Sequence, residues 1–311
     1  MCILLSTVEH EDYPFILISN RDEFFQRPTL PANIRSAGNK KILSPLDLGR
    51  SEHGSWIGVD DSGRLAVLVN YREKGDIISE ISRGVLPINY ITSNEDDDTW
   101  YDNLGDSLAT MIGSKEPVEL KRIGGFSLLY GQLKLKDGKI GKLNIISNKG
   151  DRGTIFETVQ LNDSNDNNSR LHMKEQTMGL SNSLFYEPWE KVNKGVDLLH
   201  ELMQQTKTTK FNQQQLVDKL FTLLSTDTFD QSLTDKPFTE QMFGLRNTIF
   251  VPPLDTHIKI KSPTTGRFYG TRTQTIILLD KHNNLHYYER DIIDNDDLVV
   301  KNNDQYFKFC L

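Results

Sequence analysis

The sequence predicts an α+β fold, with β-strands toward both ends of the chain and helices grouped in its middle. Short runs rich in β-branched and aromatic residues, bounded by turn residues, occur near both termini. Apolar residues at helical spacing are confined to the central part of the chain. Strands and helices do not alternate one by one, so the pattern favours layers of antiparallel sheet and helix over parallel βαβ units.

The first 70 residues predict two hairpins. Strands over 3–8 and 15–19 are separated by a charged segment and form the N-terminal hairpin. Strands over 56–59 and 65–70 are joined through a short polar segment that ends in Gly63, which is typical of a tight turn. Both hairpins are antiparallel by construction.

Helices are predicted after the second hairpin, and strands return later in the chain. Apolar residues recur at helical spacing over 97–112, 192–203 and 216–224. Further strands are predicted over 126–135, 143–147, 155–161, 248–251, 275–279 and 285–289. Because the two ends of the chain are expected to share a sheet system, we predict a single domain over residues 1–311.

Composition narrows the class of protein. The chain of 311 residues carries a formal net charge of −7, which argues against nucleic acid or an anionic membrane as the main partner. No apolar run approaches the ~20 residues of a membrane span, and the start has no basic flank of a secretory signal. The two cysteines, Cys2 and Cys310, cannot form a disulfide framework, so we expect a reducing compartment and a cytoplasmic location.

Cys2 is the first candidate for chemistry, because it directly follows the initiator methionine. Removal of Met1 would leave a cysteine whose thiol and free α-amine share one carbon. An α-amine with a pKa near ~8 can take the thiol proton, so one residue would supply nucleophile and base. Many chains begin Met-Cys without using the thiol, and that reading stays open.

A second candidate is the polar tetrapeptide at 20–23, which follows the second predicted strand. One reading is a strand that surfaces into a charged turn. In the other reading the hairpin returns the chain to its own N-terminus, so that Asp22 holds the Cys2 ammonium. Arg21 would then lower the thiol pKa or bind a substrate carboxylate. Alternation places Arg21 and Asp22 on opposite faces, so both serve one site only where the strand ends or bulges.

These residues resemble the NRDE family, also called the transport-and-Golgi-organisation family. The resemblance rests on Met1-Cys2-Ile3 and on the segment 18–24, which contains Asn20-Arg21-Asp22-Glu23. It continues in the same order through 43–47, 54–58, 63–71, 82–84, 125–128, 179–182, 188–189 and 269–273. Segments near 162–169 and 226–240 have no clear family counterpart, and we expect loop insertions there.

The family in turn resembles cysteine N-terminal-nucleophile hydrolases, which cleave amides such as penicillins, conjugated bile salts and N-acyl lipids. This resemblance implies an αββα sandwich of two mainly antiparallel sheets between helical layers. It also implies that Cys2 is the nucleophile and that Asp22 contacts the nucleophile's amine. Asn70 matches an oxyanion-hole asparagine, and Asn182 matches an asparagine that orients substrate and nucleophile. From the residues alone, the simpler interpretation of each asparagine is a turn residue at the end of a strand.

The arginines follow the hydrolase pattern less closely. Where the hydrolases place an arginine before Asn-x-Asp, this chain has Ser19. Arg21 lies two residues further on, on the same strand face, and is the candidate replacement. Arg272 is the candidate for a second, late arginine that binds substrate. Arg83, near a predicted helix start, is a candidate anion contact or a plain capping segment.

Two functions from different classes follow. The first is hydrolysis of a C–N amide bond in a small acylated substrate, with no cofactor required and no metal. The second is a non-catalytic factor in Golgi organisation and protein secretion, or in intracellular haem or lipid trafficking, with haem as a bound or carried ligand. The resemblance implies a cytoplasmic protein associated with an organelle, Golgi or mitochondria, and a small-molecule ligand or substrate. Neither protein partners nor the oligomeric state follow from the sequence.

Overall fold

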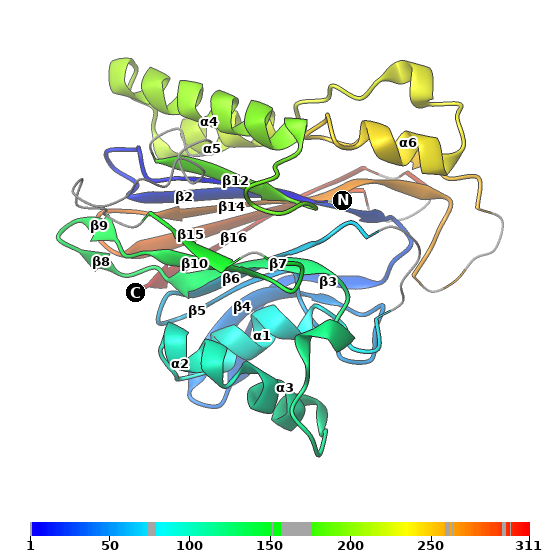
Figure 1. Ribbon diagram of the computed structural model, residues 1–311. Coiled ribbons are helices and arrows are strands. Elements are labelled where there is room, and N and C mark those ends of the chain that lie inside the picture. Colours follow the sequence, from blue (N-terminus) through cyan, green and yellow to red (C-terminus); the bar gives the residue numbers. More distant parts are fainter. Residues whose placement is uncertain are drawn as a thin grey trace. The chain divides into compact units, whose positions relative to one another are not determined.

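The computed structural model describes residues 2–73, 79–150, 152–156, 176–258, 262, 264–293, 297–298 and 300–311, with the backbone alone at 300–303. Its contacts group into two compact units. Unit 1 comprises residues 1–27 and 159–309, and unit 2 comprises residues 28–158 and 310–311. Each unit contains one large sheet (Figure 1).

The sheet of unit 1 has the order β12-β1-β2-β14-β15-β16, with β13 beside β14. The N-terminal strand β1 lies in its interior and pairs antiparallel with both β2 and β12. The strands are β1 (Ile3–Thr7), β2 (Phe15–Phe24), β12 (Thr177–Ser181), β13 (Leu254–Asp255), β14 (Phe268–Leu279), β15 (Asn284–Ile293) and β16 (Val300–Cys310). Segments from both ends of the chain therefore share one sheet, as predicted.

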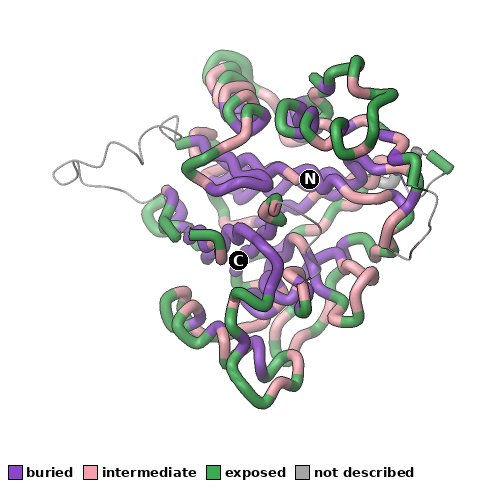
Figure 2. Tube along the Cα trace, turned by 45° about the vertical axis from the view of Figure 1, so that its right-hand side comes forward, coloured by how far each residue is buried: buried purple, intermediate pink, exposed green. Residues whose placement is uncertain are grey.

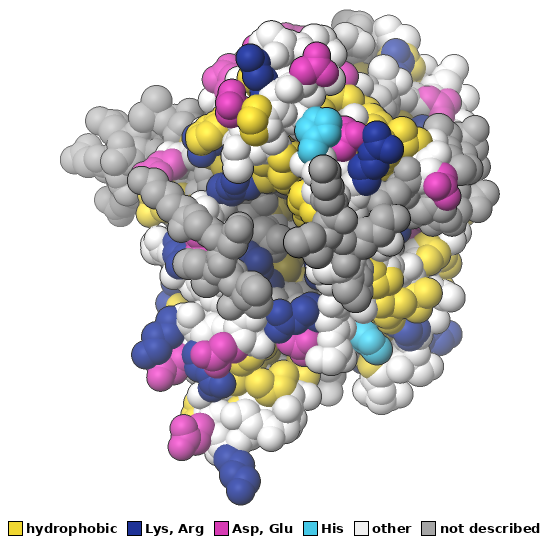
Figure 3. Space-filling view, turned by 90° about the vertical axis from the view of Figure 1, so that its right-hand side faces the viewer, with side chains coloured by type: hydrophobic (Ala, Val, Ile, Leu, Met, Phe, Trp, Pro, Cys, Tyr) yellow, Lys and Arg dark blue, Asp and Glu magenta, His cyan; other side chains and the backbone are white. Residues whose placement is uncertain are grey.

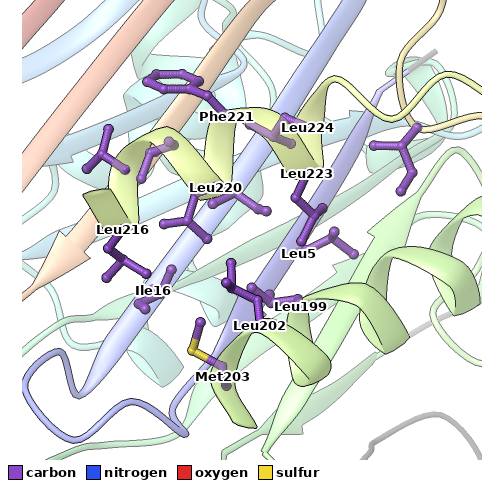
Figure 4. Close-up of a cluster of buried hydrophobic side chains, with 14 of the residues drawn as sticks. Leu5, Ile16, Leu199, Leu202, Met203, Leu216, Leu220, Phe221, Leu223 and Leu224 are labelled. Atoms are coloured by element: carbon purple, nitrogen blue, oxygen red, sulfur yellow. The ribbon is translucent and has the colours of Figure 1, made fainter. Parts of the chain in front are cut away.

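Two long helices, α4 (Glu190–Thr208) and α5 (Gln213–Leu224), cover one face of this sheet. Both are amphipathic, and their apolar stripes pack against the inward side chains of β1, β2 and β14. Figure 4 shows the close-up, in which side chains of α4 and α5 lie against Leu5 and Ile16. A Cβ atom on Gly195 of α4 would lie 2.7 Å from Leu5 Cδ1, so glycine allows the helix to approach β1 closely. The short helices η2 (Gln231–Leu233) and α6 (Phe238–Gly244) complete the described helices of unit 1.

The sheet of unit 2 has the order β11-β10-β7-β6-β5-β4-β3, and its described pairings are antiparallel. Helices α1 (Val85–Thr92), α2 (Asp97–Asp102) and α3 (Leu104–Ile112) cover one face, and η1 (Leu120–Arg122) precedes β7. The strands are β3 (Thr29–Ala37), β4 (Lys40–Asp47), β5 (Ile57–Asp60), β6 (Arg64–Asn70), β7 (Phe126–Gln132), β10 (Leu143–Ser147) and β11 (Arg152–Ile155). A separate hairpin joins β8 (Leu135–Lys136) to β9 (Lys139–Ile140).

Three aromatic rings form the centre of the unit 2 core. Trp100 packs edge-on against Tyr90 with ring centroids 4.9 Å apart, and Tyr130 completes the group at 4.8 Å from Trp100. Their polar atoms are satisfied, since Trp100 Nε1 donates to Asn89 Oδ1 at 2.8 Å and the Tyr90 hydroxyl donates to Asp97 Oδ1 at 2.6 Å. Most residues of β1, β2, β6 and β7 are buried, and Figure 2 colours the chain by burial.

The predicted α+β class, with two mainly antiparallel sheets and helical layers, is confirmed. Several details differ. The strands β3 and β4 over 29–47, and also β12 and β16, were not predicted; β3 is an edge strand whose apolar alternation is weak. The segment 248–251, predicted as a strand, is a loop in which the Val251 N–H and C=O bond to Thr271 of β14.

The prediction of a single domain stays a prediction. The polar segment 162–169 lies outside the described residues. Residues 226–240 form a loop that contains η2 and the start of α6. Among the residues the structure describes, no helix has both the length and the apolar character needed to cross a membrane. The face drawn in Figure 3 carries basic and acidic side chains as well as hydrophobic ones.

Asn20 ties the central strand β2 to the helical layer. Its side-chain amide Nδ2 donates to the Leu224 carbonyl at the end of α5 (2.8 Å) and to the Ile249 carbonyl (2.9 Å). Its Oδ1 accepts from Gln274 Nε2 at 3.3 Å. The first residue of the polar tetrapeptide is therefore a buried structural link.

We expect Asn20→Ala to lower the free energy of unfolding by about 1–3 kcal/mol, because two buried carbonyls lose their donor. Urea unfolding followed by circular dichroism measures the change. Asn193→Ala, at an exposed position of α4, is the matched control and should change stability by less than ~0.5 kcal/mol. Equal stability of Asn20→Ala and wild type would contradict the structural role.

Candidate active site

The register of β1 determines which residues flank Cys2. Ile3 pairs with Asn20 of β2 on one side and with Ser181 of β12 on the other. One residue earlier, Cys2 therefore lies beside Arg21 and Asn182. The start of the strand is held in place, because Ser181 Oγ donates to the Cys2 carbonyl at 2.7 Å. The hairpin thus returns the chain to its own N-terminus, as the sequence analysis expects.

Asp22 lies one residue further along β2 and is buried. Its Oδ1 accepts a hydrogen bond from Thr271 Oγ1 at 2.8 Å, and its backbone carbonyl accepts one from the Tyr269 hydroxyl at 3.0 Å. Lys191 Nζ lies 3.7 Å from the other carboxylate oxygen, Oδ2. Burial raises the pKa of Asp22, and the positive charge of Lys191 and the hydrogen bond from Thr271 oppose that rise.

A bulge lies in β14 opposite these residues. Asp22 pairs with Thr271 and Arg21 pairs with Thr273, so Arg272 is the extra residue. The predicted end or bulge of the strand that carries Arg21 and Asp22 is not found, since β2 continues to Phe24 and the bulge lies in the partner strand β14.

Arg272 stabilises the segment at the end of β2. Its Nη1 donates to the carbonyl of Arg27 and, at 3.5 Å, to the carbonyl of Phe24. The side chain is buried. A contact between Arg272 and substrate stays a prediction, whereas its hydrogen bonds to the β2 exit are a feature of the fold.

Arg21 is buried and pairs with Glu23 two residues along the same strand face, with Arg21 Nη2 3.6 Å from Glu23 Oε2. Asp22 points to the opposite face, toward α4, where Lys191 lies. Arg21 and Asp22 nevertheless both influence the pKa of the Cys2 thiol, because Cys2 lies just before the first residue of β1. Burial raises the pKa of the Cys2 thiol and the Asp22 carboxylate adds to that rise, whereas the Asp22 backbone N–H and the Arg21 charge lower it.

Lys191 is the site residue that the sequence analysis missed. It lies in the first turn of α4, its side chain is fully buried, and its Nζ is 5.9 Å from the centre of the Trp189 ring. Burial lowers the pKa of Lys191, and the charges of Asp22 and Cys2 counteract this. The available signal was spacing, since Lys191 and Gly195 are four residues apart on the buried stripe of a helix.

The remaining candidates are placed as follows. Asn182 is buried directly after β12, next to Cys2 in the register. Asn70 is the exposed last residue of β6 in unit 2. Arg83, also in unit 2, donates from Nη1 to the Gly125 carbonyl at 2.9 Å. The predicted roles of all three residues in catalysis or substrate binding stay predictions.

Within the described ranges, no cluster of three or more histidine, cysteine, aspartate or glutamate side chains has the arrangement needed to hold a metal ion. The candidate site comprises Cys2, Arg21, Asp22, Lys191 and Thr271 of unit 1.

Comparison with known proteins identifies the family. The family model described as Transport and Golgi organisation 2 matches residues 1–294. The chain belongs to this family. An uncharacterised protein of Saccharomyces cerevisiae is 29% identical, covering 97% of this chain and 95% of its own length. The Transport and Golgi organization protein 2 homolog of Homo sapiens is also 29% identical, covering 95% of each chain.

Solved structures similar to this chain include an acylase and a hydrolase. Penicillin V acylase from Agrobacterium tumefaciens is 11% identical, with a TM-score of 0.39 over 98% of this chain and 86% of that chain. A variant of conjugated bile acid hydrolase from Clostridium perfringens is 10% identical, with a TM-score of 0.41 over 99% of this chain and 97% of that chain.

The buried Asp22–Lys191 pair generates a stability prediction. Lys191→Met and Asp22→Asn should each lower the free energy of unfolding by about 3–5 kcal/mol, because each leaves one buried ionisable group without its partner. The double variant should recover most of that loss. Chemical denaturation of the four proteins measures the coupling.

Lys207→Met, an exposed lysine at the other end of α4, is the control and should be near neutral. Strictly additive losses in the double variant would show that the two groups are energetically independent.

Proposed function

We propose that this protein hydrolyses the C–N amide bond of a small acylated substrate, with Cys2 as an N-terminal nucleophile. The observation that carries the proposal is the placement of Cys2 at the start of an interior strand, next to the buried Asp22. The Asp22 backbone N–H lowers the pKa of the Cys2 thiol, and the Asp22 carboxylate is paired with Lys191. A partly exposed thiol thus lies beside a buried carboxylate and a buried ammonium.

The raised thiol pKa indicates which proton transfer is needed. A thiol that stays protonated at neutral pH requires a base before it can attack a carbonyl. Once Met1 is removed, the α-amine of Cys2 can take the thiol proton, and the Asp22 carboxylate can hold the resulting ammonium. The sulfur then bonds to the carbonyl carbon, the C–N bond breaks, and the ammonium returns its proton to the leaving amine.

Water completes the reaction. It attacks the thioester carbon and gives one proton to the α-amine, which passes it to the departing thiolate, so the acid is released and Cys2 is regenerated. From the sequence, Asn70 is predicted to donate to the negative oxygen, and Asn182 is predicted to orient the substrate and the nucleophile. Loss of one oxyanion-hole donor typically costs ~10²–10³-fold in rate. Arg21 would attract a carboxylate on the substrate or favour the thiolate.

The second candidate is a non-catalytic factor that acts in Golgi organisation or secretion, or that carries haem or a lipid, in the cytoplasm or at an organelle. The observation in its favour is the name of the relatives, since the human and Bos taurus proteins that match 95% of this chain are called Transport and Golgi organization protein 2 homologs. In this reading Cys2 and its neighbours line a ligand site without turnover.

The amidase proposal predicts a mature chain that begins at Cys2 and a thiol that is modified before Cys310. Intact mass spectrometry before and after limiting iodoacetamide measures both, because Cys310 is exposed and serves as the internal reference. Cys2→Ala should abolish turnover of N-acyl test amides, and Cys310→Ala should leave turnover unchanged.

Retention of Met1, or preferential modification of Cys310, would overturn the nucleophile role. The carrier candidate is checked by haem titration of the wild type and Cys2→Ala. A saturable change in the haem absorbance spectrum that persists in Cys2→Ala would favour the carrier, and an unchanged spectrum would count against haem as its ligand.

A further inference from the structure

The buried ammonium of Lys191 is unusual enough to require a reason. Lysine is almost never fully buried in proteins unless it is paired, because removing its charge from water is costly. Here the exposed fraction of the side chain is 0%, and the Asp22 carboxylate is equally buried. For stability alone, two apolar side chains of similar volume would serve as well or better.

The backbone around Lys191 holds the side chain in this position. The Lys191 N–H donates to the Arg246 carbonyl at 2.9 Å, which anchors the first turn of α4. Gly195, one turn later, allows close contact with Leu5 of β1. The helix therefore cannot easily retreat to expose the ammonium, and the lysine is directed at the end of β2.

The Lys191–Asp22 ion pair has a long separation. Lys191 Nζ is 3.7 Å from Asp22 Oδ2, which is longer than a charge-assisted hydrogen bond, and Nζ has no hydrogen-bond acceptor within the described residues. The opposite carboxylate oxygen, Oδ1, is already bonded to Thr271. The Lys191 ammonium thus places a positive charge beside Asp22 without a short hydrogen bond to Oδ2.

We infer that Lys191 is a positioning residue of the Cys2 site, which keeps Asp22 ionised and oriented so that Asp22 can hold the Cys2 ammonium. This inference rests on the proposed nucleophile role of Cys2. The charged and titratable groups around Cys2 are Asp22, Arg21 and Lys191, with Glu23 beside Arg21. Without Lys191, the buried carboxylate takes up a proton and loses its attraction for an ammonium.

The test measures the rate of Cys2 alkylation between pH 5 and 9 in full-length protein whose mass shows that Met1 is absent. Alkylation does not require substrate turnover, and Cys310 reports the intrinsic reagent rate in the same sample. In Lys191→Met, the rate of Cys2 alkylation at pH 7 should fall about tenfold, because a protonated Asp22 no longer holds the Cys2 ammonium that favours the thiolate. A tenfold fall corresponds to a rise of one unit in the thiol pKa. The alkylation rate of Cys310 should be unchanged. Lys191→Arg should restore most of the rate, because arginine keeps the positive charge.

A double-mutant cycle separates positioning from packing. If Lys191 acts through Asp22, Lys191→Met has almost no further effect in the Asp22→Asn background. Lys207→Met is the matched control and should show the wild-type profile. If Lys191→Met alone fails to fold, the double variant Lys191→Met/Asp22→Asn can still be measured, because it removes both members of the buried pair.

Two results would overturn the inference. One is a wild-type pH profile in Lys191→Met; the other is a loss in the double variant that equals the product of the two single losses. An unreactive Cys2 in the wild type would instead defeat the proposed function itself, so the two failures can be told apart.

Discussion

The placement of β1 between β2 and β12 is the constraint on which the candidate site depends. A five-residue strand in a sheet interior is held by hydrogen bonds on both edges, and its register is set by which side chains face the helices. A slip of one residue would turn Ile3 and Leu5 away from the apolar stripes of α4 and α5. The same register that buries those two side chains therefore also fixes Cys2 beside Arg21 and Asn182.

Electrostatics then determines what this position can do. Burial pushes the Cys2 thiol, the Asp22 carboxyl and the Lys191 amine toward their neutral forms. Nearby charges and hydrogen bonds, among them the attraction between Asp22 and Lys191, work against this effect. Such a cluster lowers the stability of the fold. Clusters of groups with shifted pKa values are more frequent at functional sites than elsewhere. The bulge in β14 fits this picture, because it places Thr271 on Asp22 and sends Arg272 to the exit of β2.

Many of the strands and helices could be predicted from the local pattern of apolar and polar residues. The N-terminal hairpin, the second hairpin and the two central amphipathic helices follow from alternation and helical spacing, which depend only on neighbours in sequence. The strands over 29–47 were missed because an edge strand exposes much of both faces and shows no clean alternation. The loop over 248–251 was mistaken for a strand, since its β-prone residues bond to the bulge of β14 rather than to a regular ladder.

The order of residues determined that a cysteine stands at position 2, that a strand returns to it, and that Asn20, Arg21 and Asp22 arrive together. The sequence could not show that these three residues have different structural roles, because those roles depend on groups far away in the chain. Asn20 binds carbonyls more than 200 residues later, and Asp22 meets Lys191 of α4, a helix that approaches β1 closely at Gly195. A lysine on an otherwise apolar helical stripe looks like a surface residue until the packing of that stripe is known. Burial is a property of the assembled layers, and it is burial that makes this lysine chemically significant.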